Sequence, residues 1–305
     1  MKMGLDQGAP PETWNLRYPD RIRSVHRGYI EAGAQIILTN TFGGTHFRLK
    51  LHNLQDQVHE VNLIATQLAR AEADTAMAAG GPPVVIAGSI GPSGEILEPL
   101  GDCSFAEAKA GFAQQAAALT EGGADVLWLE TMSDLNEVAA AVEGARSASH
   151  LPVAITMTFD TNGHTMMGVS PSYAAQILKD YNPIAIGGNC GNGVAELEGA
   201  IQGMYAVDQT IPLVAKSNAG IPQWIDGREV YTAGPSEMAE YAVRVRNMGA
   251  KIIGACCGST ADHIRMMGQA LRQAPIEPIA IVAEVPDNGP ARRNRSSRRR
   301  SRLER

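Results

Sequence analysis

Cysteine is scarce in this sequence: 305 residues contain only four, and two of these are adjacent. Secreted proteins stabilised by disulfides do not have this pattern. No apolar run approaches the roughly 18 residues that span a bilayer. The N-terminus, MKMGLDQGAPPETW, lacks the apolar core of a signal peptide. These absences predict a soluble protein in a reducing, cytoplasmic compartment, with no membrane partner.

Basic side chains are scarce outside the C-terminus. Residues 291–305 hold eight of the 26 Lys and Arg residues and one of the 32 acidic residues. The remainder therefore has 18 basic and 31 acidic side chains, and a body this acidic is not expected to bind nucleic acid. The composition predicts a folded domain over residues 1–280 and a basic, disordered tail over residues 281–305. The tail would serve solubility or dock on the protein itself, or it would make weak contact with RNA or an anionic surface.

Seven short runs are apolar along almost their whole length, without alternation. They are residues 36–42, 84–90, 126–132, 153–159, 184–190, 212–218 and 251–257. Strands covered on both faces, as in a parallel sheet, have this pattern. Segments with helical spacing lie between the runs. The phrase G-A-x-(I/V)-(I/L) marks a helix-to-strand junction at Gly33, Gly123 and Gly249.

This alternation predicts an α/β protein, a (β/α)8 barrel of the TIM type. Only seven strands can be identified, however. A helix begins near Asp20, and the strand that should precede it has no counterpart, because residues 1–19 contain no apolar run. The sequence therefore predicts a barrel whose first strand is missing from this chain: either the natural start is absent, or another feature closes the barrel.

Three of the four cysteines end two of the predicted strands. Cys190 ends one, and Cys256 and Cys257 end another. In such a barrel the C-terminal strand ends meet at one mouth, where functional residues gather. Three thiolates can hold one Zn²⁺ and leave a fourth position open, as in catalytic zinc sites. Adjacent strand residues face opposite ways, so both can be ligands only where the strand turns, which glycines at 254 and 258 permit. The alternative is that these cysteines are small buried apolar side chains.

Other polar residues also stand at strand ends. Glu130 ends the run VLWLE, where a carboxylate needs a partner: either a bound ammonium group or a salt bridge that closes the barrel mouth. Lys216 has a comparable position. The further candidates for substrate binding are Asn40, Thr41, Asn189 and Asn218. For Asn40 and Asn218, hydrogen bonds that stabilise loops are an equal alternative.

Several motifs together resemble one known family. TNTF (39–42), GPSGE (91–95), ETM (130–132), GGNCG (187–191) and GACCG (254–258) are similar to motifs of the homocysteine-binding S-methyltransferases. That family includes betaine–homocysteine methyltransferase and the first module of cobalamin-dependent methionine synthase. The resemblance runs from about residue 11 to 272. The stretches 43–52 and 160–171 look most similar to bacterial betaine–homocysteine methyltransferases.

The resemblance implies a zinc-containing (β/α)8 barrel that makes methionine from homocysteine. It implies that Cys190, Cys256 and Cys257 hold one Zn²⁺ per chain and that the homocysteine thiol takes the open position. It also implies that Glu130 helps to bind the amine of the amino acid. The family's first strand carries an acidic Asp-Gly motif that also helps to bind homocysteine, and this sequence lacks that motif.

The methyl donor is expected to be a small onium compound, with betaine as the first choice. Aromatic side chains in loops and at strand ends, such as Phe42 and Trp224, could surround its cation. The alternatives are a homocysteine module that uses methylcobalamin or S-methylmethionine, and a truncated, non-catalytic barrel that binds zinc or an amino acid. Homo-oligomer formation is compatible with the sequence.

Overall fold

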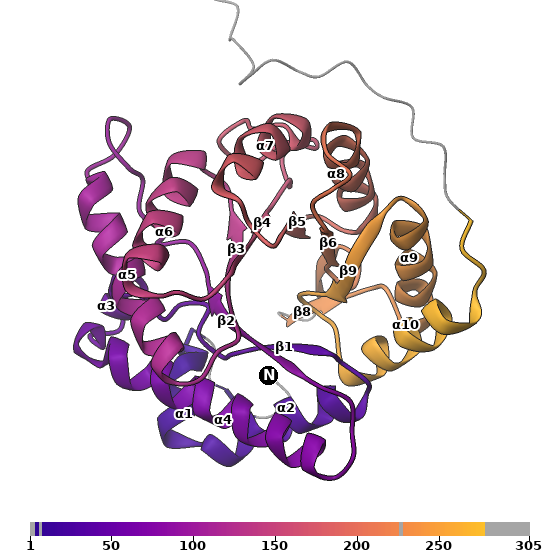
Figure 1. Cartoon of the computed structure of the whole chain (residues 1–305), viewed down its shortest axis with the longest axis horizontal. Helices are drawn as coiled ribbons and strands as arrows, with labels where there is room; N and C mark the ends of the chain where they lie inside the picture. The colour runs from indigo at the N-terminus through magenta and orange to yellow at the C-terminus, as the bar shows by residue number, and fades with distance from the viewer. Residues whose placement is uncertain (1–3, 6–7, 226–227, 278–305) are drawn as a thin grey trace, which may run out of the picture.

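Seven parallel strands form one curled sheet in the computed structural model, which describes residues 4–5, 8–225 and 228–277 (Figure 1). Their order in the sheet is β1-β2-β3-β4-β5-β6-β9. They are β1 (Ile36–Leu38), β2 (Val85–Ile90), β3 (Val126–Met132), β4 (Val153–Met157), β5 (Ala185–Cys190), β6 (Leu213–Ser217) and β9 (Ala250–Ala255). Each lies within or beside one of the seven apolar runs, so the predicted barrel-type fold is confirmed. Within the described ranges there is no eighth parallel strand.

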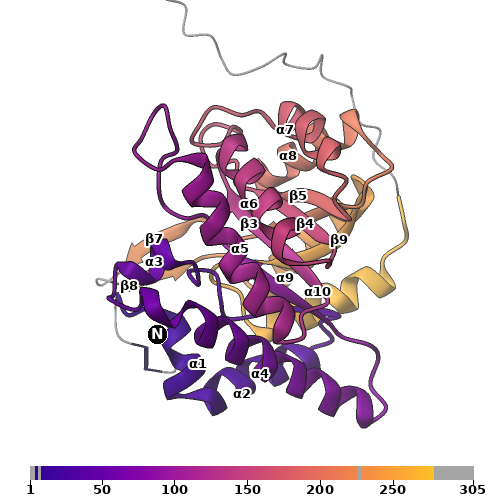
Figure 2. The same cartoon turned by 60° about the vertical axis from the view of Figure 1, so that its left-hand side comes forward.

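Helices follow the strands and cover the outside of the sheet (Figures 1 and 2). The longer ones are α2 (Pro19–Glu31), α4 (Val58–Ala78), α5 (Phe105–Glu121), α6 (Leu135–Ala148), α7 (Pro171–Leu178), α8 (Val194–Val207), α9 (Pro235–Asn247) and α10 (Ala261–Gln273). Short helical segments are η1 (Pro11–Thr13), α1 (Trp14–Arg17), α3 (His46–Lys50), η2 (Gln55–Gln57) and η3 (Lys179–Tyr181). The βα repeat read from the sequence is therefore present.

Both faces of the sheet are buried, which explains the unbroken apolar runs. One face packs against the helices, with side chains such as Leu127, Ile155 and Ile186 in the main core. The other face lines the interior of the curled sheet. There Ala87, Val126, Trp128, Ala154, Ala185 and Val214 form a separate apolar cluster. Because successive strand residues point to opposite faces, alternate residues enter the two clusters.

Local signals set where the helices begin and end. Ser104, Asp134 and Ser170 each accept a hydrogen bond from a backbone N–H of the helix that follows, as expected of N-caps. The junction glycines Gly33 and Gly123 have φ of 95° and 93°. These left-handed values favour glycine and turn the chain from helix to strand.

An antiparallel hairpin, β7 (Pro222–Ile225) with β8 (Arg228–Tyr231), follows β6 and was not predicted. The run IPQW-IDG-REVY carries an Asp-Gly pair between two short segments, which is a signal for a hairpin. The hairpin packs beside the second cysteine motif: a Cβ on Gly258 would lie 2.2 Å from the Tyr231 ring.

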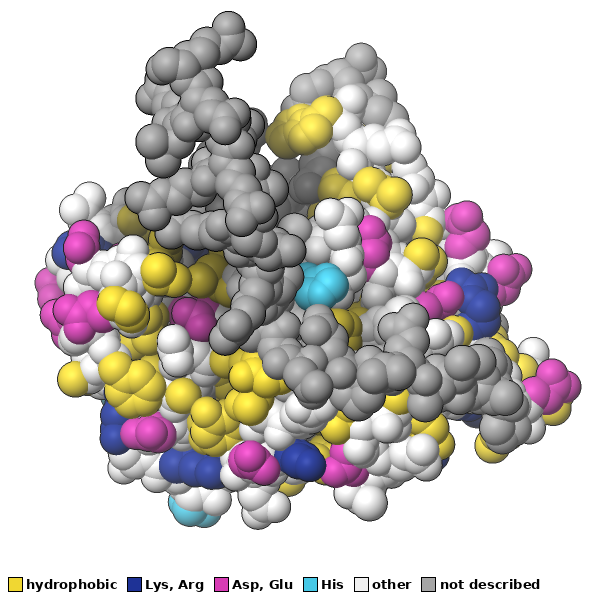
Figure 3. Space-filling view, turned by 90° about the horizontal axis from the view of Figure 1, so that it is seen from above, with side chains coloured by type: hydrophobic (Ala, Val, Ile, Leu, Met, Phe, Trp, Pro, Cys, Tyr) yellow, Lys and Arg dark blue, Asp and Glu magenta, His cyan; other side chains and the backbone are white. Residues whose placement is uncertain are grey.

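The outer surface carries charged, polar and apolar side chains side by side on the face drawn in Figure 3. Among the described helices, none is long and apolar enough to cross a bilayer. The proposed tail, residues 281–305, lies outside the described residues, so the division at residue 280 stays a prediction.

Candidate metal centre and substrate site

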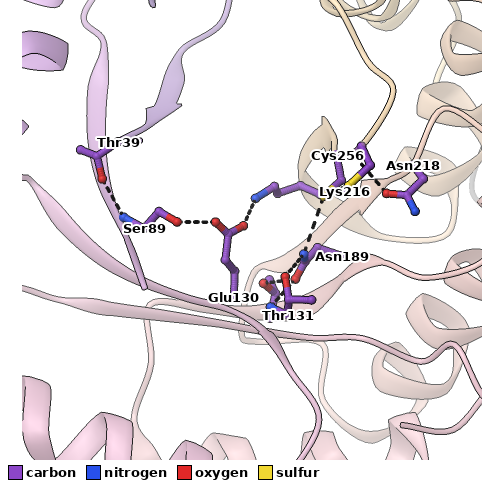
Figure 4. A network of polar contacts seen from close by, with 10 residues as sticks. Thr39, Ser89, Glu130, Thr131, Asn189, Lys216, Asn218 and Cys256 are labelled. Atoms are coloured by element: carbon purple, nitrogen blue, oxygen red, sulfur yellow. Dashed lines mark hydrogen bonds and ion pairs between the residues drawn. The ribbon is translucent and has the colours of Figure 1, made fainter. Parts of the chain in front are cut away.

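A polar layer lies directly above the apolar interior of the sheet. Two residues after Ala87, Trp128, Ala154 and Val214, the same faces of β2, β3, β4 and β6 present Ser89, Glu130, Thr156 and Lys216. On β5 the polar residue is Asn189, which lies four residues after Ala185 and pairs with Lys216 of β6 in the sheet. All five are less than a tenth exposed. The period of two along each strand therefore gathers separate strand ends into one buried polar site, shown in Figure 4.

The three cysteines at the strand ends come together. The Sγ atoms of Cys190, Cys256 and Cys257 all lie within 4.8 Å of one another, and those of Cys256 and Cys257 are 4.0 Å apart. Cys190 has a φ of 64°, so the chain turns sharply where β5 ends. β9 ends at Ala255, which leaves both following cysteines outside the regular strand. Adjacent side chains can therefore face one point, as the sequence required.

The two glycines beside the cysteine pair serve different purposes. Gly258 has a φ of 78° and turns the chain, as expected. Gly254 does not adopt a left-handed conformation. A Cβ there would instead lie 3.3 Å from Cγ of Lys216, so this glycine makes room for the lysine stem. The expectation that both glycines permit the turn holds for Gly258 only.

Proton sharing among the thiols shifts their acidities in opposite directions. Hydrogen bonds from Cys256 and then Cys257 lower the pKa of Cys190 to about 3. The same contacts with Cys190 raise the pKa of Cys256 and of Cys257. Sulfur donors of this kind suit a soft or borderline cation such as Zn²⁺ better than Mg²⁺ or Ca²⁺. The chemistry of the cluster thus fits a zinc ion, with Cys190, Cys256 and Cys257 as the residues that could hold it.

Two asparagines brace the cysteine loops. The side chain of Asn218 accepts a hydrogen bond from the Cys257 N–H (3.0 Å) and donates one to the Gly191 carbonyl (2.6 Å), so it joins the two cysteine motifs. Asn189 accepts from the Thr131 N–H (2.9 Å) and from the Thr156 hydroxyl (2.6 Å), and it donates to the Thr131 hydroxyl (2.7 Å). Its amide nitrogen is also 4.0 Å from Sγ of Cys256. These contacts fix the strand ends around the sulfurs.

Glu130 has two partners in the polar layer. Its Oε1 accepts a hydrogen bond from the Ser89 hydroxyl at 2.5 Å, and its Oε2 lies 2.7 Å from Nζ of Lys216. Both members of the ion pair are buried, with side chains 9% exposed. The salt bridge at the barrel mouth, one of the two alternatives for Glu130, is therefore present. Its partner could not be named from the sequence.

A cavity of about 360 Å³ leads to this carboxylate. Its walls are residues 8–12, Thr39–Gly43, Arg48, Leu51, His52, Ser89 and Glu130. Glu12 is buried in the wall, where its carboxylate accepts a hydrogen bond from the Gly43 N–H at 2.7 Å. Burial raises the pKa of Glu12. The cavity is large enough for small molecules of the size of an amino acid.

Asn40 and Thr41 line the same cavity but already have protein partners. The Asn40 amide donates to the Pro11 carbonyl (2.8 Å) and to Oδ1 of Asn15 (3.0 Å). The Thr41 hydroxyl is fully buried and donates to the Ser89 carbonyl at 2.7 Å. These contacts hold the N-terminal segment and the end of β1 in place. A role of either residue in substrate binding stays a prediction.

Comparison with known proteins identifies the family to which this chain belongs. The family model for homocysteine S-methyltransferase matches residues 5–271. The chain belongs to the homocysteine S-methyltransferase family. It is 32% identical over 266 residues to methionine synthase from Mycobacterium leprae, and 32% identical over 280 residues to methionine synthase from Mycobacterium tuberculosis. These alignments cover 85% and 88% of the chain but only 22% and 23% of the two relatives.

Solved structures of this family share the fold. The homocysteine methyltransferase MmuM from Escherichia coli, in its oxidised and metallated forms, superposes with a TM-score of 0.74 at 23% identity. Each alignment covers 88% of this chain and 91% of that chain. The homocysteine S-methyltransferase resemblance read from the sequence motifs is thus confirmed, and so is the fold that it implied.

Proposed function

We propose that this chain transfers a methyl group to the thiol of homocysteine and so produces methionine. The observation that carries the proposal is the convergence of three cysteine sulfurs within 4.8 Å, in a chain whose family match covers residues 5–271. The nearby cavity supplies a buried carboxylate, Glu130, for the ammonium of the amino acid. The cysteine cluster and this carboxylate thus lie at neighbouring points of one barrel mouth, as the proposal requires.

Cys190, Cys256 and Cys257 are the proposed holders of one Zn²⁺. When bound, zinc supplies Lewis acidity that keeps a thiol deprotonated at neutral pH, where a free thiol with a pKa of about 8.5 is mostly protonated. The chain's residues do the remaining work. The cysteine loops, braced by Asn218, fix the point to which the substrate sulfur comes. Glu130 fixes the other end of the amino acid, and together they orient the sulfur.

A small onium compound, betaine in the first instance, is the proposed methyl donor. Three thiolates around a divalent cation have a net negative charge, which favours a cationic donor. Phe42 lies in the cavity wall and is 39% exposed, so its ring can contact such a cation. The second candidate donor is methylcobalamin, favoured by the 32% identity to the two methionine synthases.

The direct test has two stages. Zinc per chain is measured first on the purified protein and on Cys257→Ala. Methionine formation from homocysteine is then measured with betaine, S-methylmethionine and methylcobalamin in turn. We expect about one zinc per chain, turnover with betaine, and loss of both in Cys257→Ala. Zinc without turnover on any donor would support the non-catalytic binding barrel, and turnover with methylcobalamin alone would replace betaine as the donor.

A further inference from the structure

Lys216 is a buried cation that depends on one carboxylate. Its side chain is 9% exposed, and its Nζ lies 2.7 Å from Oε2 of Glu130. Among the ion pairs of the described residues, it is the only one in which both side chains are less than a tenth exposed. A lysine is rarely buried this fully unless it is paired. Among the ion pairs of the described residues, its one partner is Glu130, the residue proposed to bind the substrate ammonium.

The lysine is held in position by its surroundings. Its aliphatic stem passes beside Gly254, where the lack of a side chain leaves room for it. Its Nζ lies 5.3 Å from the centre of the Trp128 ring. In the sheet, Lys216 pairs with Asn189 of β5 and with Gly254 of β9. The next residue of β5 is Cys190, and Cys256 lies two residues beyond Gly254. Figure 4 shows Lys216 extending toward Glu130 from beside Cys256.

A second cation at Glu130 would disturb this balance. If only an ammonium group arrived, two positive charges would share one buried carboxylate. Charges in a poorly solvated site are costly unless each has a partner. A ligand that also brings a negative charge solves the problem, because its ammonium can bind Glu130 while its own anion takes over Lys216. An α-amino acid carries its ammonium and carboxylate on the same carbon.

We propose that Lys216 binds the α-carboxylate of homocysteine. With Glu130 it forms a clamp of opposite charges that recognises a zwitterionic α-amino acid, and in the free protein the two halves neutralise each other. The inference rests on the proposed function, since it takes homocysteine as the substrate. It makes Lys216 a specificity-determining residue, distinct from the cysteines that are proposed to hold the metal.

Binding of three thiols to the zinc-loaded full chain tests the clamp. The ligands are L-homocysteine, 3-aminopropanethiol, which lacks the carboxylate, and 4-mercaptobutanoate, which lacks the ammonium. Calorimetry gives the dissociation constants. We expect the wild type to prefer homocysteine by on the order of 100-fold over either analogue, because each analogue leaves one buried charge unpaired. In Lys216→Met, homocysteine binding should weaken on the order of 100-fold while 3-aminopropanethiol binds as well as before or better.

Matched variants separate the clamp from general damage. Lys216→Arg keeps the charge and should keep most of the preference for homocysteine. Glu130→Gln should lose the preference over 4-mercaptobutanoate instead. Lys109→Met removes a lysine from a surface ion pair with Glu143 and should change nothing. Zinc content and thermal unfolding of each variant show whether the site is still assembled.

Two results would overturn the proposal. One is a wild type that binds 3-aminopropanethiol within threefold of homocysteine, which decides the matter even if Lys216→Met does not fold. The other is a folded Lys216→Met with unchanged homocysteine binding and a raised KM for betaine, which would make Lys216 a receptor for the donor's carboxylate. Failure of the proposed function looks different, because the wild type would then form no methionine with any donor.

Discussion

Asn218 illustrates how a single residue can shape the proposed metal site without being one of its ligands. It is 3% exposed, and its side-chain amide bridges the Cys257 N–H and the Gly191 carbonyl. One bridge therefore sets the spacing between the two cysteine motifs. Residues that orient metal ligands in this way influence affinity nearly as much as the ligands do. Of the two interpretations that the sequence left open for Asn218, these contacts favour the stabilisation of loops.

Replacing Asn218 by Ala should lower zinc affinity by roughly 10- to 100-fold. The cysteines remain, but their loops lose the hydrogen bonds that hold the sulfurs within reach of one another. Competition with a chromogenic chelator measures the affinity. Asn218→Asp is the matched variant: it keeps the acceptor for Cys257 but loses the donor to Gly191, so an intermediate affinity is expected. Affinity unchanged in both variants would show that the loops hold their geometry without the bridge.

The ion pair of Glu130 with Lys216 could not be predicted from the sequence. Both were recognisable as polar residues at strand ends. Their contact depends on how β3 and β6 are placed across the interior, since they are not neighbouring strands in the sheet. The identity of a partner 86 positions away cannot be read from local periodicity. The cysteine cluster was predictable because all three residues are thiols, which bind the same metals, and because they stand in two recognisable motifs at strand ends.

At the scale of elements, α2 packs against α4, and a buried histidine of α2 lies near a carboxylate of α4. His26 of α2 is 5% exposed, and its Nε2 has no hydrogen-bond partner in the described structure. Burial lowers the pKa of His26 to about 4, although the nearby charge of Glu72 acts in the opposite direction. Glu72 of α4 is itself bound by Arg23 and Arg27 of α2. The helix pair therefore contains a neutral imidazole near an ionised carboxylate whose charge is balanced by two arginines.

The free energy of unfolding should decrease as the pH is lowered, because His26 is buried in its neutral form. Its folded pKa lies below the unfolded value of 6.5, so below pH 6.5 the unfolded chain binds a proton that the folded chain refuses. The stabilising contribution is complete above about pH 6.5 and is lost as the pH falls toward 4. Between pH 7.5 and 5 the loss from this residue is roughly 2 kcal/mol.

Urea unfolding of the wild type and of His26→Met at both pH values measures this loss. The variant should lose roughly 2 kcal/mol less than the wild type over the same interval. His59→Gln, at an exposed position paired with Glu121, should behave as the wild type does. Equal pH dependence in all three proteins would mean that His26 can take up a proton without unfolding α2 from α4.

Among the elements, those with a strong local signal were predicted and those without one were not. The seven parallel strands were found because burial on both faces leaves an unbroken apolar run. Ser104 and Ser170 mark helix starts through their side-chain hydrogen bonds, and Gly33 and Gly123 mark helix ends because glycine adopts the left-handed backbone conformation there. The hairpin β7–β8 is an exception: its Asp-Gly pair is a turn signal, but the hairpin was missed because its strands are only four residues long and carry no apolar run. The short helix α3 was also missed, since five residues are too few for a period to show.

At the scale of the whole molecule, the cysteine cluster joins distant parts of the chain. Cys190 ends β5, whereas Cys256 and Cys257 follow β9, and β6 lies between these strands in the sheet. An ion bound only by the folded arrangement stabilises the fold by mass action. If zinc is present at 100 times its dissociation constant, the gain is about 2.7 kcal/mol. The proposed site is therefore a structural link as well as a reaction centre.

Removal of zinc should accordingly lower the unfolding temperature. A gain of this size corresponds to a shift of about 5 °C for a domain of roughly 270 residues. Calorimetric unfolding of zinc-loaded and chelator-treated protein, under reducing conditions so that the thiols stay free, measures the difference. Cys257→Ala should unfold at nearly the same temperature with and without zinc, because two sulfurs hold the ion too weakly. A full shift that persists in Cys257→Ala would place the stabilising ion elsewhere, and the three-sulfur site would then have to be abandoned as the link between β5 and β9.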